Sequence, residues 1–253
     1  MTDRDDVTIV TGGSSGIGLA TARALVAADS SAHVALVDIN EPDPSSVPEV
    51  SRDRLHFFHC DVADQPQVTE CAATVAGAYR LAGVVNSAGI VIAATPSEEL
   101  SLADFRRVLS IHVEGSLLWS QMAARVWLRE GRPGAIVNVG SVAARFGWPG
   151  RLAYGAAKLA IESMTRTLAV EWADHGIRVN AVCPGYVDTP LQDDSRRPPG
   201  LPTLTEAAAR HALGRVAAPE EIAAGIMFLL SERASFITGE VLVLDGGFSV
   251  LKS

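Results

Sequence analysis

The chain has 253 residues, of which 48% are hydrophobic, and a formal net charge of -8 at pH 7. This length and apolar content suit one substantial domain with a sizeable core, and no break in composition suggests a second domain. The acidic balance argues against nucleic-acid binding, which calls for a basic surface. The first residues lack a signal-peptide layout, and no apolar run approaches the ~20 residues that span a bilayer. We therefore expect a cytoplasmic protein that does not bind membranes.

Short β-branched runs alternate along the chain with alanine-rich segments of helical periodicity. The runs predict strands at residues 7–10, 33–37, 55–60, 83–85, 135–139, 178–182 and 241–244. The segments between them predict helices near residues 17–28, 65–79, 102–128, 152–174 and 219–231. Because the strands are nearly all apolar, the alternation predicts a single α/β domain over residues 1–253, with a doubly wound parallel sheet and helices on both faces. Ligands of such folds bind at the carboxyl ends of the strands.

A glycine-rich turn, Thr11-Gly-Gly-Ser-Ser-Gly-Ile-Gly18, joins the first predicted strand to the first helix. Gly12, Gly16 and Gly18 let the backbone turn sharply and approach a pyrophosphate, to which the following helix presents unpaired N–H groups. The spacing differs from the commoner Gly-x-Gly-x-x-Gly, and a tight turn without a ligand is the alternative. The position after a strand favours a dinucleotide site.

Polar residues close the next three strands. Asp38 ends the second strand, where a carboxylate accepts hydrogen bonds from the adenosine ribose and repels a 2′-phosphate. No arginine or lysine in the glycine turn or soon after Asp38 would neutralise that phosphate, so we predict NAD(H) rather than NADP(H). A solvated loop carboxylate is the alternative. Asp61 closes the third strand and could meet the adenine amino group. Asn86-Ser-Ala-Gly89 closes the fourth, with small residues that let a cofactor pass closely.

Three residues of the second half suggest a proton-transfer site. Tyr154 and Lys158 stand four apart on a predicted helix, so their side chains share one face. A cation beside a phenol favours the phenolate and lowers its pKa from about 10. Ser141, at the end of an apolar strand, offers a hydroxyl that could hold a carbonyl or alkoxide oxygen at the same point. Alone, a Tyr/Lys pair of this spacing is common and without function.

In order and spacing, these motifs resemble the short-chain dehydrogenase/reductase family, specifically its short single-domain, Rossmann-like branch. The likeness spans nearly the whole chain and includes Pro184-Gly185. It implies reversible hydride transfer between NAD(H) and an alcohol/ketone pair. Tyr154 would be the general acid/base, Ser141 would orient the substrate oxygen, and Lys158 would bind the nicotinamide ribose and lower the Tyr154 pKa. The implied cofactor-binding residues are Gly12, Ser14, Ser15, Gly16, Ile17, Gly18, Asp38, Asp61, Val62, Asn86, Ala88, Gly89, Tyr154, Lys158, Pro184, Gly185, Val187 and Thr189.

His112 departs from the family pattern, which usually places an asparagine there to hold a water that joins the lysine to solvent. Ser87 is a milder departure, since a second asparagine is more usual. A histidine can still donate and accept hydrogen bonds, and its ordinary pKa of about 6.5 could add a titration near neutrality. We therefore count His112 as a catalytic candidate in a retained proton relay. The alternative is that His112 packs beside the helix and the relay runs elsewhere.

The segments beside this site, residues 90–96, 142–152 and 186–204, are mainly apolar, which predicts a hydrophobic secondary alcohol or ketone as substrate. Phe146 and Trp148 are the expected walls, with a core or interface position for Trp148 as the alternative. Whether Arg145 or Arg151 reaches the substrate stays open.

The remaining predictions concern motion, assembly and metals. The Pro/Gly-rich residues 196–202 predict a mobile substrate lid at about 188–212. By resemblance we expect a homotetramer, with a dimer as the next choice. Cys60, Cys71 and Cys183 are odd in number and lack metal-ligand spacing, so we expect buried thiols and no metal site. An epimerase or dehydratase using the same Tyr/Lys pair, and a non-catalytic NAD-binding module, are the rival functions.

Overall fold

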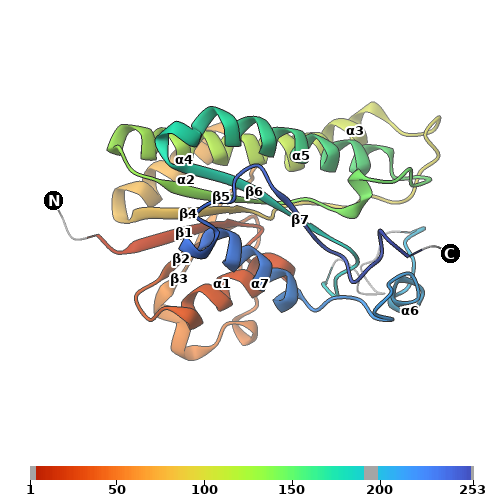
Figure 1. Cartoon of the computed structure of the whole chain (residues 1–253), viewed down its shortest axis with the longest axis horizontal. Helices are drawn as coiled ribbons and strands as arrows, with labels where there is room; N and C mark the ends of the chain where they lie inside the picture. Colours follow the sequence, from red (N-terminus) through yellow and green to blue (C-terminus); the bar gives the residue numbers. More distant parts are fainter. Residues whose placement is uncertain (1–3, 191–198, 252–253) are drawn as a thin grey trace.

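The computed structural model of the chain describes residues 4–190 and 199–251. Within these residues, seven parallel strands form one sheet in the order β3-β2-β1-β4-β5-β6-β7 (Figure 1). All seven predicted strands are confirmed. Their bounds are β1 (Asp6–Thr11), β2 (His33–Asp38), β3 (Leu55–His59), β4 (Arg80–Asn86), β5 (Gly134–Val139), β6 (Ile177–Pro184) and β7 (Val241–Leu244).

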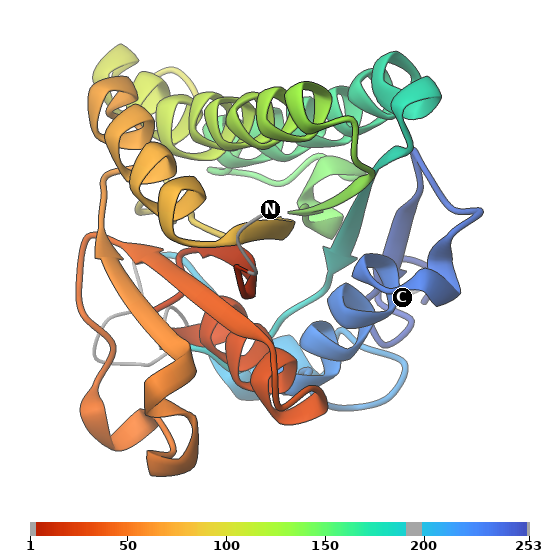
Figure 2. The same cartoon turned by 90° about the vertical axis from the view of Figure 1, so that its left-hand side faces the viewer.

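Helices cover both faces of the sheet, as the doubly wound prediction requires (Figure 2). On one face lie α1 (Gly16–Ala28) and α7 (Pro219–Leu230), and on the other α2 (Gln65–Ala78), α4 (Gly115–Glu130) and α5 (Leu152–Trp172). The strand order reverses between β1 and β4, whose crossovers leave on opposite faces. A crevice forms at such a switch point, outside the carboxyl ends of the strands.

The predicted helix at 102–128 is divided in the structure. It consists of α3 (Leu102–Leu109), one π-helical turn (Ser110–Glu114) and α4. A π-helical turn inserts extra backbone into a helix and often marks a functional position. Here it holds the buried His112. Sequence periodicity missed the interruption because the apolar positions continue through it.

The lid prediction extends beyond the described residues, since residues 191–198 lie outside them. Its described part contains a helix that the sequence did not predict, α6 (Leu204–Ala208). Thr203 and Glu206 cap its N-terminus reciprocally, because each side chain bonds the backbone N–H at the other's position. The mobility of this segment and the homotetramer stay predictions.

Two apolar layers hold the sheet between its helices. One contains the fully buried Trp119 and Trp127 of α4, and the other contains Ile222 and Ile226 of α7. Burying a large apolar side chain contributes about 1.5–3 kcal/mol. The Trp127 indole N–H donates to the Leu81 carbonyl at 2.9 Å, which satisfies its polar atom inside the layer. The three cysteines are buried and free, as predicted.

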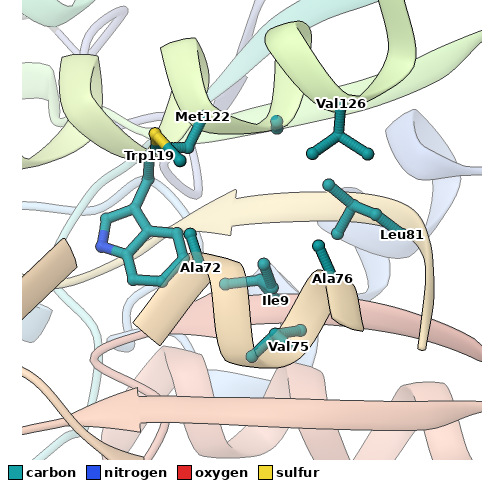
Figure 3. A pocket seen from close by; sticks show the side chains of 9 residues that line it. Ile9, Ala72, Val75, Ala76, Leu81, Trp119, Met122 and Val126 are labelled. Carbon is teal, nitrogen blue, oxygen red and sulfur yellow. The ribbon is translucent and has the colours of Figure 1, made fainter. Parts of the chain in front are cut away.

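A void of about 10 Å³ lies in the layer formed by α2, α4 and the sheet (Figure 3). Apolar side chains surround it, among them Ile9 of β1, Val75 of α2 and Met122 of α4. This volume holds about one water-sized sphere, and a water there needs polar partners. The void is therefore a packing defect rather than a ligand site. Over residues 4–190 and 199–251, no helix is long and apolar enough to cross a membrane.

Candidate active site

A cleft of about 680 Å³ opens at the carboxyl ends of the central strands. Its walls come from the glycine turn and from the segments that follow β2, β3, β4, β5 and β6. The predicted site residues that line it are Gly12, Ser15, Gly16, Ile17, Asp38, Asp61, Val62, Ala88, Gly89, His112, Ser141, Tyr154, Lys158, Pro184, Gly185, Val187 and Thr189. The fold thus brings most of the predicted catalytic and cofactor residues to one place.

The glycine turn is shaped for close backbone approach. Gly12 and Gly16 have φ of 63° and 51°, which residues with a side chain rarely adopt. A Cβ on Gly12 would lie 2.8 Å from the Ala88 Cα, and one on Gly18 would lie 2.1 Å from the Gly12 carbonyl oxygen. Gly18 therefore serves the turn itself rather than the cleft lining. No side chain caps α1 at Ser15, so its first N–H groups remain available to a phosphate.

Asp38 is anchored at the edge of the cleft. Its carboxylate accepts hydrogen bonds from the backbone N–H groups of Ser14 and Asn40, both at 3.2 Å. The bond from Ser14 ties the end of β2 to the glycine turn and fixes the carboxylate at the edge of the cleft. Ser14 was predicted to bind the cofactor, but it does not line the cleft. Its buried hydroxyl has no hydrogen-bond partner among the described residues.

Asn86 has a structural role that the sequence did not indicate. It lies 3% exposed beneath the cleft, and its amide donates to the Asn138 side chain at 2.8 Å and to Ser120 Oγ at 3.1 Å. It thereby links β4, β5 and α4. The loop after it is held by Thr11, whose hydroxyl accepts from the N–H groups of Ser87 and Ala88. This link follows from strand pairing, so sequence spacing did not reveal it.

Ser141, Tyr154 and Lys158 meet at one end of the cleft. Tyr154 and Lys158 share a face of α5, with the Lys158 ammonium 5.6 Å from the centre of the phenol ring. Lys158 is 5% exposed, and its ammonium donates to the Val139 carbonyl at 2.7 Å. This hydrogen bond holds the ammonium at the last residue of β5. Ser141 Oγ accepts from the Ala143 N–H, so its own proton stays free to donate.

The electrostatics of the phenol differ from the prediction. Burial raises the pKa of Tyr154, and a hydrogen bond with Ser141 and the charge of Arg151 oppose this rise. The direction is opposite to the lowering expected from Lys158, because an apolar surround disfavours the phenolate. Burial also lowers the pKa of Lys158 to about 8, since it disfavours the ammonium.

His112 lies beside Tyr154, and their ring centres are 5.5 Å apart at 86°. Its Nε2 atom is 2.8 Å from the Ile90 carbonyl oxygen and 3.1 Å from the Ile90 nitrogen. Its buried Nδ1 atom has no partner among the described residues. Burial, with the nearby charge of Lys158, lowers the pKa of His112 to about 3. The expected titration near neutrality is therefore wrong, because the ring is only 3% exposed and stays neutral.

An aromatic cluster stands next to the catalytic residues. Trp148 stacks on Phe248 at 5.8 Å and contacts Tyr186 edge-on at the same distance, while Phe146 meets Phe248 at 6.1 Å. Phe146 and Trp148 were predicted as substrate walls, but neither side chain lines the cleft. Trp148 packs with Phe248 against the buried Val142 and Cys183, which is the core position given as its alternative. His211 positions Tyr186, since its Nε2 accepts from the Tyr186 N–H at 3.2 Å.

The structure shows where three arginines lie relative to the cleft, which the sequence analysis left open for Arg145 and Arg151 and did not consider for Arg107. Arg107 of α3 lines the cleft, which spacing along the chain did not suggest. Arg145 turns to the buried Glu162 of α5, with 3.6 Å between its Nε and the carboxylate. Arg151 is buried, and its positive charge partly opposes the rise that burial causes in the Tyr154 pKa. In the described part of the chain, no group of acidic, histidine or cysteine residues could hold a metal ion.

Known proteins resemble this chain over nearly its whole length. The family described as Enoyl-(Acyl carrier protein) reductase matches residues 12–249, from the glycine turn to the C-terminal segment. The chain belongs to the short-chain dehydrogenase/reductase family. It is therefore an oxidoreductase with a nicotinamide cofactor, and the fold predicted from the sequence is confirmed.

Members of the short-chain dehydrogenase/reductase family with named activities are close in sequence. The 2,5-dichloro-2,5-cyclohexadiene-1,4-diol dehydrogenase of Sphingobium indicum is 40% identical over 96% of both chains. The cis-4-hydroxycyclohexanecarboxylate dehydrogenase of Sinomonas cyclohexanicum is 41% identical over 97% of both chains. The solved structure of ElxO with NADP bound has a TM-score of 0.85 at 28% identity, and covers 98% of this chain and 100% of that chain.

Proposed function

We propose that this protein reversibly oxidises a hydrophobic cyclic secondary alcohol to a ketone, with NAD(H) as the hydride carrier. The observation behind the proposal is the meeting of Ser141, Tyr154 and Lys158 at the end of the cleft. The two relatives named above act on alcohols borne on six-membered rings, as their names state. Ile90, Val91 and Val187 line the same cleft, and apolar side chains beside a proton-transfer site suit such a ring.

Each catalytic residue has a stated part in the proposed reaction. The Ser141 hydroxyl, free to donate, holds the substrate oxygen next to the Tyr154 hydroxyl. Tyr154 first releases its own proton to solvent. As a phenolate it then takes the alcohol proton during oxidation, and as a phenol it donates that proton during reduction. Lys158 holds a positive charge behind the phenol, which stabilises the phenolate that forms. A bound nicotinamide would accept or supply the hydride.

The residues around the cleft suit a dinucleotide. The φ values of Gly12 and Gly16 and the uncapped N-terminus of α1 fit a pyrophosphate. Asp38, held by two backbone N–H groups, suits the two hydroxyls of an unphosphorylated ribose and would repel a 2′-phosphate. ElxO binds NADP, so family membership by itself leaves the choice between the two cofactors to residues such as Asp38.

A substrate panel tests this function and the cofactor preference together. Cyclohexanol, a cyclohexane-1,4-diol and linear secondary alcohols would be offered with NAD⁺ or NADP⁺, and formation of the reduced nicotinamide followed by absorbance. We expect turnover of ring alcohols, with kcat/KM at least about 10-fold higher with NAD⁺, since one unfavourable charge contact costs more than about 1.4 kcal/mol. Preference for NADP⁺ would contradict the role of Asp38. No turnover despite tight NADH binding would contradict the enzymatic proposal.

His112 is proposed to keep the proton relay by hydrogen bonding rather than by charge. Its unpartnered Nδ1 can accept a hydrogen bond from a water that also bonds Lys158, while its Nε2 stays with Ile90. We expect His112→Leu to lower kcat by about 10-fold or more and His112→Asn to keep it within about 3-fold. The measurements are kcat in light and heavy water across pH, with the melting temperature as a control for folding. Equal rates and solvent isotope effects for wild type and His112→Leu would place the relay elsewhere.

A further inference from the structure

Residues 184–189, which follow β6, contribute one wall of the cleft. This segment begins on the side of Ser141, because β5 and β6 are paired in parallel up to their last residues. It ends at the glycine turn, where a Cβ on Gly16 would lie 3.2 Å from the Thr189 Cγ2. The wall therefore runs from the catalytic residues to the turn that fits a pyrophosphate. A nicotinamide and its ribose would lie along this interval.

The middle of this wall is held from behind by His211. The ring is 4% exposed and does not line the cleft. Its Nε2 accepts a hydrogen bond from the N–H of the buried Tyr186 at 3.2 Å. Gly185 leaves room for the ring, since a Cβ there would lie 2.6 Å from Nε2. The imidazole thus sets the position of two consecutive residues of the wall.

His211 also connects the wall to α6. Its Nδ1 lies 2.8 Å from the Ala207 carbonyl oxygen. A carbonyl only accepts a hydrogen bond, so Nδ1 carries the proton, and the Tyr186 N–H only donates, so Nε2 carries none. Both bonds together require a neutral imidazole in this one tautomer. The ring therefore acts as a link of fixed geometry between α6 and the wall.

The contacts around this link keep both of its ends in place. The His211 ring packs against Phe248 and Tyr186, with ring centres 5.3 Å and 5.9 Å apart. The Tyr186 carbonyl accepts from the Ala217 N–H at 2.9 Å, so the main chain of Tyr186 is bonded through both of its polar groups. Loss of the bond to His211 would leave a buried N–H without its acceptor and the wall with one anchor fewer.

We propose that His211 is a positioning residue for the cofactor, because its bond to Tyr186 holds the wall that the nicotinamide meets. Its kinetic consequence rests on the proposed alcohol oxidation. Two uncharged substitutions separate the two bonds of the ring. The amide oxygen of glutamine can take the place of Nε2, whereas the shorter asparagine reaches only the place of Nδ1. His211→Gln therefore keeps the acceptor for Tyr186, and His211→Asn keeps only the bond to Ala207.

A binding experiment tests the proposal without any turnover. The dissociation constants of NADH and of ADP-ribose, which lacks the nicotinamide, would be measured by calorimetry for the wild type and both variants. We expect His211→Asn to weaken NADH binding about 10-fold and ADP-ribose binding less than about 2-fold, and His211→Gln to stay within about 3-fold for both ligands. Unchanged NADH binding in His211→Asn would overturn the proposal. Equal losses for the two ligands would also overturn it, because they indicate a purely structural role.

His175→Asn is the matched control for these variants. His175 is exposed and precedes Ile177, the first residue of β6, at the opposite end of that strand from the cleft. Both dissociation constants should equal those of the wild type. The melting temperature of each protein reports on folding.

Nitrogen NMR of the histidine-labelled wild type tests the same link without a folded variant. We expect a protonated Nδ1 and an unprotonated Nε2 for His211, and a shift of the Nε2 signal with NADH but not with ADP-ribose. The opposite tautomer, or the same shift with both ligands, would overturn the proposal.

The kinetic measurement is kcat for alcohol oxidation at saturating NAD⁺. We expect it to fall about 10-fold in His211→Asn and to stay within about 3-fold of the wild type in His211→Gln, since a misplaced nicotinamide transfers hydride more slowly. Equal kcat values for His211→Asn and the wild type would overturn the positioning role. If no alcohol reacts but NADH and ADP-ribose binding separate as expected, only the proposed function fails.

Discussion

Tyr154→Phe is expected to lower kcat/KM for alcohol oxidation by about 10³- to 10⁴-fold while NADH binding changes less than about 3-fold. The substitution removes only the hydroxyl that exchanges a proton with the substrate. The remaining ring still packs edge-on against His112, where the ring centres are 5.5 Å apart. The raised pKa of Tyr154 means that the phenol is protonated before substrate and cofactor bind. The measurements are steady-state kinetics in both directions and the dissociation constant of NADH.

Tyr79→Phe is the matched control for this variant. Tyr79 stands at the C-terminus of α2 and packs against His33 and His56 at the start of β2 and β3, the opposite end of the strands from the cleft. Its kcat/KM should stay within about 2-fold of the wild type. Substantial activity in Tyr154→Phe would remove Tyr154 from the chemistry. Loss of both activity and NADH binding would indicate that the phenol supports the site structurally.

Lys158→Met is expected to lower kcat/KM by about 100-fold or more and to weaken NADH binding as well. The change keeps the length of the side chain but removes the ammonium that lies 5.6 Å from the Tyr154 ring and donates to Val139. Without this charge the phenolate has less stabilisation during proton transfer. Leu159→Met, at the next and 51% exposed position of α5, is the control and should leave both constants unchanged. Wild-type activity in Lys158→Met would contradict the assignment.

The pH dependence of stability gives a second measurement on Lys158. Burial lowers its pKa to about 8 in the folded protein, from 10.5 in an unfolded chain. Between these values the unfolded state binds more protons, so the contribution of Lys158 to the free energy of unfolding rises with pH. The full difference is about 3 kcal/mol, at 1.36 kcal/mol per pKa unit. Denaturant unfolding from pH 8 to 10.5 should show this rise in the cofactor-free wild type and not in Lys158→Met. Parallel curves for the two proteins would contradict it.

Local patterns were enough to predict the elements and most of the cleft. The β-branched runs gave all seven strands, because a strand covered on both faces must be apolar along its length. The glycine turn was recognisable because its backbone requires φ values that glycine adopts freely. The spacing of Tyr154 and Lys158 placed both on one face of α5, since a helix repeats about every 3.6 residues. The break at Ser110–Glu114 and the short α6 were missed, because neither interrupts or creates a periodic pattern.

The sequence by itself determined the doubly wound fold, the dinucleotide turn and the residues able to transfer a proton, because each depends on neighbours close along the chain. Only the tertiary structure decided their environments. His112 is neutral because the distant Ile90 segment buries it, and Asn86 joins strands instead of lining the cleft. Arg151 is buried, and its guanidinium bonds the carbonyl of the distant Ile92. Burial and charge compensation arise from contacts between segments far apart in the chain, so no local pattern records them.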